Sequence, residues 1–124
     1  MLVAALVDGG PHGAWAETVL AGGSLCAPEL ALAEATNIFR RLERAKLITT
    51  PEANAAQDDL MQLDIQLFPF EPFASRIWEL RHNVTSYDAW YVAIAEAVNL
   101  PLATLDEPLS KSPGVACQFL TPDF

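Results

Sequence analysis

Helix-like and strand-like segments alternate along this chain, and the alternation constrains its fold more than any other feature. Apolar residues recur at helical spacing in residues 12–21, 28–47, 50–63, 72–82 and 85–98. Short apolar runs typical of buried strands occupy residues 24–27, 65–70, 100–105 and 115–120. Residues 1–6 are small or apolar, as in a further buried helix. The pattern predicts an α/β fold, with a parallel sheet flanked by helices on both faces.

Length and composition predict a single domain covering residues 1–124, because 52% hydrophobic residues can fill one core. No apolar run approaches the roughly 20 residues that span a bilayer, and the N-terminus lacks the basic start of a signal peptide. We therefore expect a cytoplasmic protein without a membrane partner. Cys26 and Cys117 match no metal-ligand spacing, so we expect free thiols in a reducing compartment.

The formal net charge is −9, from 16 acidic and 7 basic residues. Such a charge repels nucleic acid at long range and favours a basic protein partner. Four of the basic residues fall in one short stretch: Arg40, Arg41, Arg44 and Lys46. This stretch is either a small phosphate-facing patch or a solvated helix face paired with Glu43.

Three acidic residues, Glu34, Asp88 and Asp106, lie beside residues that should form the core. A carboxylate in such a place carries a desolvation cost unless it is paired, caps a helix or holds a metal. Asp106 also follows an expected strand, and functional residues of parallel sheets gather at the carboxyl ends of the strands. These three residues are therefore the candidates for chemistry.

Each of these acids also has a purely structural explanation. Thr85 and Asp88 have the spacing of a capping box. Asp106 precedes a Glu-Pro pair, as a helix N-cap often does. Glu34 begins a polar stripe that continues through Asn37 and Arg41, and an ion pair between Glu34 and Arg41 is the competing interpretation.

Together the three acid-bearing segments resemble the PIN-domain family, in particular the VapC-type toxins of bacterial toxin–antitoxin pairs. PELALAEATNIFRRL is similar to the family's second motif, TSYDAWYVAIAEA to its third and LATLD to its fourth. The Y-D-A sequence followed by an apolar run is the most specific of these. The resemblance implies a parallel sheet flanked by helices, dependence on Mg²⁺ or Mn²⁺, and endoribonuclease activity.

The resemblance also implies roles for individual residues. Glu34, Asp88 and Asp106 take the places of the family's metal-site acids, and Thr104 takes that of a nearby hydroxyl. Asp88 and Asp106 would mainly bind the metal, while Glu34 would bind it directly or through water and help to deprotonate the attacking water. Thr104 would position that water. Two further residues, Asn37 and Arg41, would support the site from the polar stripe.

One part of the family pattern has no counterpart in this chain. The family begins with a hydrophobic strand that ends in an aspartate, whereas residues 1–3 align with the helix that follows it. We therefore expect the first strand and its acid to be absent, metal affinity to be weakened, and activity of this chain to be low or nil. The alternative is a catalytically impaired PIN-like module that binds protein. A receiver-like or phosphatase-like domain fits less well. Such domains usually need a nucleophilic aspartate in an early motif, which is absent here, and a lysine after a late strand, for which Lys111 is the one candidate.

The resemblance further implies an RNA substrate, a cognate VapB-type antitoxin and a homodimer. The negative charge suits a basic antitoxin segment lying in the acidic crevice. Candidates for an apolar contact surface between copies are Phe68, Phe70, Phe73 and Trp78, although core packing is the commoner fate of such residues.

Overall fold

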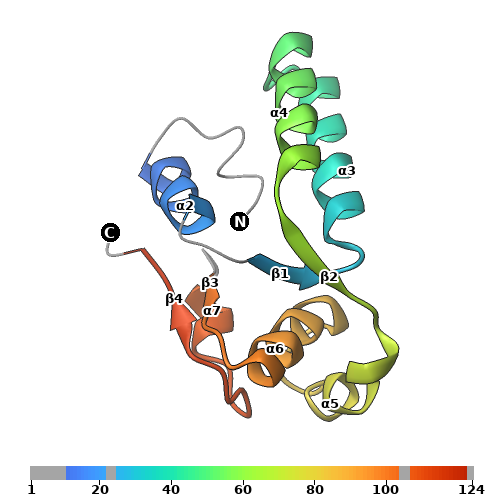
Figure 1. Ribbon diagram of the computed structural model, residues 1–124, viewed down its shortest axis with the longest axis vertical. Coiled ribbons are helices and arrows are strands. Elements are labelled where there is room, and N and C mark those ends of the chain that lie inside the picture. The colour runs from blue at the N-terminus through green and yellow to red at the C-terminus, as the bar shows by residue number, and fades with distance from the viewer. Residues whose placement is uncertain (1–10, 22–24, 104–106, 123–124) are drawn as a thin grey trace. The chain divides into compact units, whose positions relative to one another are not determined.

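The computed structural model describes residues 11–21, 25–103 and 107–122, and the chain divides into two compact units (Figure 1). The first unit comprises Met1–Leu25 and Leu30–Ile65. The second comprises Cys26–Glu29 and Gln66–Phe124. Each unit has its own cluster of buried apolar side chains. Among the described residues, no helix is long and apolar enough to cross a membrane.

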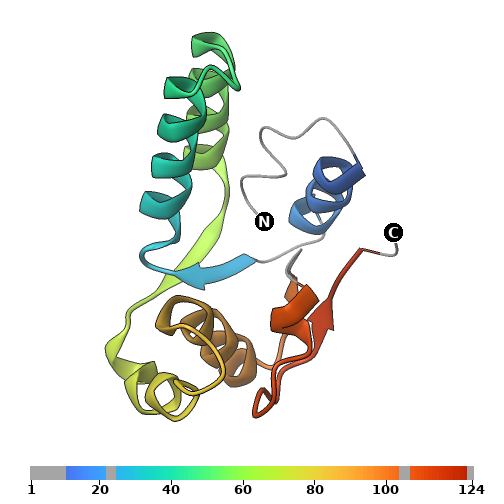
Figure 2. The same cartoon turned by 180° about the vertical axis from the view of Figure 1, so that it is seen from behind.

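The first unit contains helices α2 (Pro11–Ala21), α3 (Ala31–Arg44) and α4 (Thr50–Gln62). Figures 1 and 2 both show α3 and α4 side by side, as a helical hairpin. Between them lies a small core of four buried residues: Ala35, Phe39, Ala56 and Leu60. The Thr36 hydroxyl donates a hydrogen bond to Gln57 Oε1 at 2.9 Å, which also links the two helices.

A capping box begins α4, as its sequence predicts. The Thr49 hydroxyl accepts a hydrogen bond from the Glu52 backbone N–H at 3.2 Å, and Glu52 Oε1 accepts one from the Thr49 N–H at 2.9 Å. Pro51 fits the first turn because the missing N–H of proline needs no partner there. The hydrogen bond from the Thr49 backbone also lowers the pKa of Glu52.

Two short strand pairs are present in the described part of the chain. Strands β1 (Leu25–Pro28) and β2 (Ile65–Phe68) pair with each other, and the Glu29 N–H donates to the Phe68 carbonyl at 3.0 Å just beyond them. Strands β3 (Leu102–Ala103) and β4 (Phe119–Leu120) pair in parallel, with Leu102 opposite Phe119. Parallel pairing of strands that are separated by helices in the sequence agrees with the predicted α/β class.

The core of the second unit is built around α6 (Ser86–Val98). Six residues of this helix are buried: Ala89, Trp90, Val92, Ala93, Ile94 and Ala95. Ile77 and Leu80 pack against them from the end of the segment formed by η1 (Glu71–Phe73) and α5 (Ala74–Glu79), and Leu109 does so from α7 (Glu107–Ser110). The expectation that residues 85–98 form a helix covered on several sides is therefore confirmed.

Several boundaries differ from the sequence-based prediction. Pro28 is the last residue of β1 and is fully buried, whereas we predicted it at the start of the long helix, which begins at Ala31. Successive residues of a strand point their backbone N–H groups to opposite sides, so with the Glu29 N–H directed at β2, Pro28 removes no donor from this strand pair. The predicted strand at 115–120 is reduced to Phe119–Leu120. Residues 1–6 and 104–105, which we predicted as helix and strand, lie outside the described residues.

Trp78 is one of the four aromatic residues that we considered for a contact surface between copies. Its side chain is 67% exposed, and its ring lies against the guanidinium of Arg81, 4.3 Å from the ring centroid to Cζ. Phe68 and Phe73 instead contact each other edge to face at 5.8 Å, and Phe70 contacts Trp90 in the same way at 5.4 Å. Three of the four aromatic residues considered for a surface between copies thus have ring contacts within the second unit.

Candidate functional site

Glu34 lies in the first turn of α3, in the first unit. The packed face of this helix contains Ala31, Ala35 and Phe39, which are all buried. Glu34 itself is half-buried, so its carboxylate lies at the edge of the packed face. The positive end of the helix dipole favours a negative charge at this position.

Asn37 and Arg41 follow Glu34 on α3, and both are exposed. The rest of the basic stretch at the end of this helix, namely Arg40, Arg44 and Lys46, is exposed as well. These side chains can therefore reach water or a ligand without disturbing the packed face of the helix.

Asp88 lies in the first turn of α6, in the second unit, and is half-buried. Thr85 is the N-cap of this helix, and its hydroxyl accepts a hydrogen bond from the Asp88 N–H at 3.2 Å. The predicted capping role of Thr85 is thus confirmed. Because the threonine caps the backbone N–H of Asp88, the helix start that carries this carboxylate is fixed in place.

Two of the predicted site residues, Thr104 and Asp106, lie outside the described residues. The strand that precedes them in the sequence is described up to Ala103, and its pairing with β4 is stated above. Glu34 belongs to one compact unit and Asp88 to the other. Among the described residues, no three His, Cys, Asp or Glu side chains are gathered so as to hold a metal ion.

The chemistry of the predicted donors fits a hard divalent cation. Glu34 and Asp88 offer carboxylate oxygens, which Mg²⁺ and Mn²⁺ prefer, and neither residue is fully buried. A half-buried carboxylate leaves room for the water molecules that Mg²⁺ usually keeps when it binds to protein.

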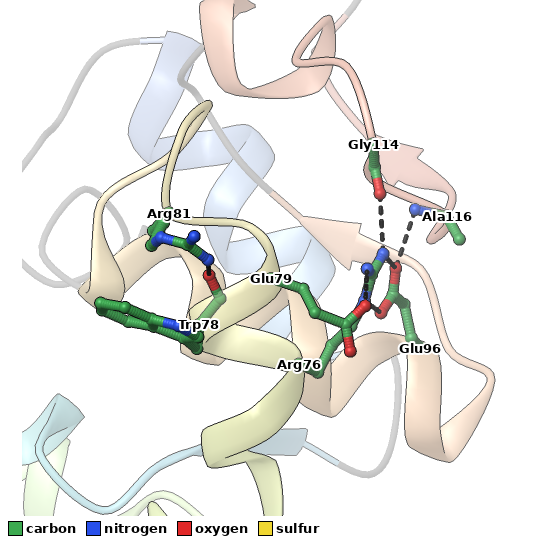
Figure 3. A network of polar contacts seen from close by, with 7 residues as sticks. All are labelled: Arg76, Trp78, Glu79, Arg81, Glu96, Gly114 and Ala116. Carbon is green, nitrogen blue, oxygen red and sulfur yellow. Dashed lines mark hydrogen bonds and ion pairs between the residues drawn. The ribbon is translucent and has the colours of Figure 1, made fainter.

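Sequence reasoning missed a polar network centred on Arg76 of α5 and Glu96 of α6 (Figure 3). The Arg76 guanidinium donates two hydrogen bonds to the Glu96 carboxylate, at 2.8 and 2.9 Å. These bonds lower the pKa of Glu96 and raise that of Arg76. The one signal in the sequence was Glu96, an acid near the end of a helix that is apolar after its first turn.

The comparisons with known proteins bear on the whole chain. The family model that matches is described as PIN domain, and it covers residues 1–114. The chain is 42% identical to "Ribonuclease VapC1" of Mycobacterium tuberculosis over 93 residues, which are 74% of this chain and 70% of that protein. It is 33% identical to "VapC ribonuclease Mb0985" of Mycobacterium bovis over 115 residues, 93% of this chain and 87% of that protein.

A third relative, "Ribonuclease VapC12" of Mycobacterium tuberculosis, is 32% identical over 104 residues, 84% of this chain and 81% of that protein. With the α/β elements described above, these matches define the class: the chain belongs to the PIN-domain family, whose fold is a three-layer α/β arrangement. Within that family it is a member of the VapC type.

Proposed function

We propose that this protein is a metal-dependent endoribonuclease, the toxin of a toxin–antitoxin pair. The observation that carries the proposal is the PIN-domain match over residues 1–114, together with three VapC relatives whose names give ribonuclease activity. The acid-bearing motifs at Glu34, Asp88 and Asp106 fall inside this match.

The proposed site takes Asp88 and Asp106 as the main ligands of Mg²⁺ or Mn²⁺. Glu34 binds the ion directly or through water and helps to remove the proton from the attacking water, which Thr104 positions. Asn37 and Arg41 extend from the same helix as Glu34 and support this arrangement. The bound ion supplies charge neutralisation and activation of water for attack on a phosphodiester.

The half-burial of Asp88 suits this role. A carboxylate that is partly removed from water attracts a divalent ion more strongly than a fully solvated one, because the interaction is less screened. The capped first turn of α6 keeps the backbone beneath Asp88 from fraying, so the carboxylate has a fixed base. The proposed ligand thus stands at the start of a capped helix.

The test is cleavage of RNA by the purified chain with and without Mn²⁺ or Mg²⁺, at a protein concentration high enough to detect the low activity expected of this chain. The Asp88→Asn variant keeps the size of the side chain and removes its charge, and we expect it to lose at least about 100-fold in rate. Asp58→Asn is the matched control, because Asp58 is exposed on α4 and lies outside every motif. Equal rates for the Asp88→Asn variant and the unaltered chain would refute the site.

The antitoxin part of the proposal needs a separate measurement. A basic segment of the partner is expected to bind the acidic toxin, given its net charge of −9. Co-purification with the product of the neighbouring gene, followed by loss of RNA cleavage in the complex, supports this part. Failure of the two proteins to associate at micromolar concentration removes it.

We propose a homodimer as well, since the side chains of Phe70, Trp78 and Tyr87 are 42%, 67% and 59% exposed in the second unit. Light scattering behind size-exclusion chromatography measures the mass directly. The mass of a monomer at about 50 µM protein would contradict the proposed homodimer.

The second candidate function is a PIN-like module that binds protein without catalysis. Its distinguishing outcome is antitoxin binding without RNA cleavage and without any thermal shift at millimolar Mn²⁺. A Mn²⁺-dependent rise in melting temperature that Asp88→Asn abolishes favours the nuclease.

A further inference from the structure

The Arg76–Glu96 network joins three segments of the second unit, as Figure 3 shows. Arg76 Nε and Nη2 donate to Glu96 Oε1 and Oε2 at 2.8 and 2.9 Å, which links α5 to α6. Arg76 Nη2 also donates to the Gly114 carbonyl at 2.7 Å, and Glu96 Oε2 accepts from the Ala116 N–H at 2.8 Å. One ion pair therefore holds the backbone at residues 114–116 from two sides.

The ion pair differs from an ordinary surface salt bridge in geometry and burial. Its two parallel hydrogen bonds fix the orientation of both side chains, and the side chains are only 32% and 16% exposed for Arg76 and Glu96. The neighbouring pair between Arg76 and Glu79 is longer, at 3.4 Å, and the Glu79 side chain is 64% exposed. The Arg76–Glu96 contact, rather than the Arg76–Glu79 contact, can therefore hold its two side chains in one fixed position.

The segment held by this network leads directly to the strand pair before the fourth motif. Two residues beyond Ala116, the Gln118 carbonyl accepts a hydrogen bond from the Leu102 N–H at 2.8 Å. Phe119 and Leu120 then pair with Leu102 and Ala103, the residues that immediately precede Thr104 in the sequence. A ladder of only two residues per strand gives little rigidity by itself, so its anchoring at residues 114–116 matters.

The same network also includes the helix that carries Asp88. Glu96 lies eight residues after Asp88 on α6, about 12 Å along the helix axis. A packed helix transmits its position over that length, because α6 is buried on several sides. The network therefore connects α6, which carries Asp88, to the β3–β4 strand pair, whose strand β3 precedes Asp106 in the sequence.

We infer that Arg76 and Glu96 are positioning residues, which set the α6 helix against the β3–β4 strand pair so that the Asp88 carboxylate is held in place for a divalent ion. This inference rests on the proposed function. Carboxylates that bind Mg²⁺ or Mn²⁺ must be held within a few tenths of an ångström, because these ions demand near-ideal octahedral geometry. Neither Arg76 nor Glu96 needs to touch the ion or the RNA.

The closing experiment measures Mn²⁺ affinity by isothermal titration calorimetry, well below the melting temperature of each variant. Arg76→Lys keeps the charge but loses the two-pronged geometry, and Glu96→Gln keeps the size but loses the charge. Both are expected to raise the dissociation constant for Mn²⁺ about tenfold, as loss of supporting partners around metal ligands commonly does. If one variant fails to fold, the other carries the test.

Two matched controls accompany these variants. Arg81→Lys alters an exposed arginine whose guanidinium lies against the Trp78 ring and donates to the Trp78 carbonyl. Glu79→Gln alters the exposed acid that meets the same guanidinium. Both are expected to keep the Mn²⁺ affinity of the unaltered chain, since the polar contacts of these two side chains among the described residues are with Arg76 and Trp78.

Exchanging the charges of Arg76 and Glu96 distinguishes a positioning role from a role in stability alone. The double variant Arg76→Glu with Glu96→Arg restores an ion pair, but it places an acceptor against the Gly114 carbonyl and a donor against the Ala116 N–H. We expect it to regain melting temperature without regaining Mn²⁺ affinity. Amide hydrogen exchange in residues 100–107 and 112–120 is expected to stay faster than in the unaltered chain.

Two outcomes overturn the inference: an unchanged Mn²⁺ dissociation constant in folded Arg76→Lys and Glu96→Gln, or full recovery of Mn²⁺ affinity in the charge exchange. Absence of both Mn²⁺ binding and RNA cleavage in the unaltered chain is a different failure. It refutes the proposed function, and the positioning role falls with it.

Discussion

The α3–α4 hairpin of the first unit and the α6 core of the second are stabilised in different ways. In the hairpin, a capping box starts α4, and the two helices bury a narrow apolar face made of alanine, phenylalanine and leucine. In the second unit, α6 is covered by side chains from α5, α7 and the neighbouring strands. The hairpin core joins two helices that follow each other in the chain, whereas the α6 core gathers side chains from many segments between Cys26 and Phe119.

Because of this difference, we expect single substitutions to destabilise the two regions to different extents. A hairpin built from caps and helical periodicity loses stability in small steps, because each cap contributes about 1 kcal/mol. A helix buried on several sides loses much more from one truncation, because the surrounding atoms cannot close the gap.

The largest effect is expected from Leu80→Ala in the second unit. Leu80 is 2% exposed, and its truncation should lower the free energy of unfolding by about 2–5 kcal/mol, measured by urea denaturation. Amide exchange should accelerate throughout α5 and α6. Leu47→Ala is the control, since Leu47 is 72% exposed and should change stability by less than about 0.5 kcal/mol. Exchange that also accelerates equally in α3 and α4 would show that the two regions unfold together.

Acidification is expected to weaken the second unit through Glu96. The hydrogen bonds from Arg76 hold the pKa of Glu96 below its ordinary value of 4.5 in the folded protein. The stabilisation is therefore complete at neutral pH and is lost as the pH falls below about 4.5 through the folded pKa. Urea denaturation at pH 7 should show Glu96→Gln to be less stable than the unaltered chain by about 1–2 kcal/mol. The gap should narrow toward pH 3, and a constant gap contradicts this account.

A smaller effect is expected at the start of the hairpin. Thr49→Ala removes the hydroxyl that caps the Glu52 N–H and should cost about 1 kcal/mol. Thermal unfolding followed by circular dichroism measures the change. Thr50→Ala, one residue further on, keeps the cap and serves as the comparison. Equal melting temperatures for the two variants would show that the Thr49 cap does not stabilise the hairpin.

The smallest effect should be a gain. Lys46, just after α3, has a φ of 60°, a left-handed conformation that disfavours side chains with a Cβ. Lys46→Gly relieves that strain and should stabilise the hairpin by about 0.5 kcal/mol, after the extra entropy of glycine in the unfolded chain is subtracted. Lys111→Gly, in the second unit and without a positive φ, is the control and should not stabilise.

The sequence predicts the elements well where the forces are local. The cap at Thr49, the cap at Thr85 and the all-round burial of α6 were each readable from residue types and spacing. The class of fold and the family were readable as well, from alternation and from the Y-D-A motif. The candidate site residues stay predictions, with Asp88 placed in the first turn of α6 and Glu34 in the first turn of α3.

The failures are non-local. Helical periodicity could not tell that Trp78 lies in water against Arg81, or that Arg76 turns toward a helix twenty residues away. Both outcomes depend on which segment packs beside α5, and that information is spread over the whole second unit. The helix start predicted at Pro28 was wrong because a proline suits both the start of a helix and the end of a strand.

The burial of Trp90 gives the protein an optical reporter. Its indole is 9% exposed and packed edge to face against Phe70, and its Nε1 has no hydrogen-bond acceptor among the described residues. Such an indole emits at shorter wavelength than the water-exposed Trp78. The fluorescence spectrum should therefore shift to the red when solvent enters the α6 core, without any added label.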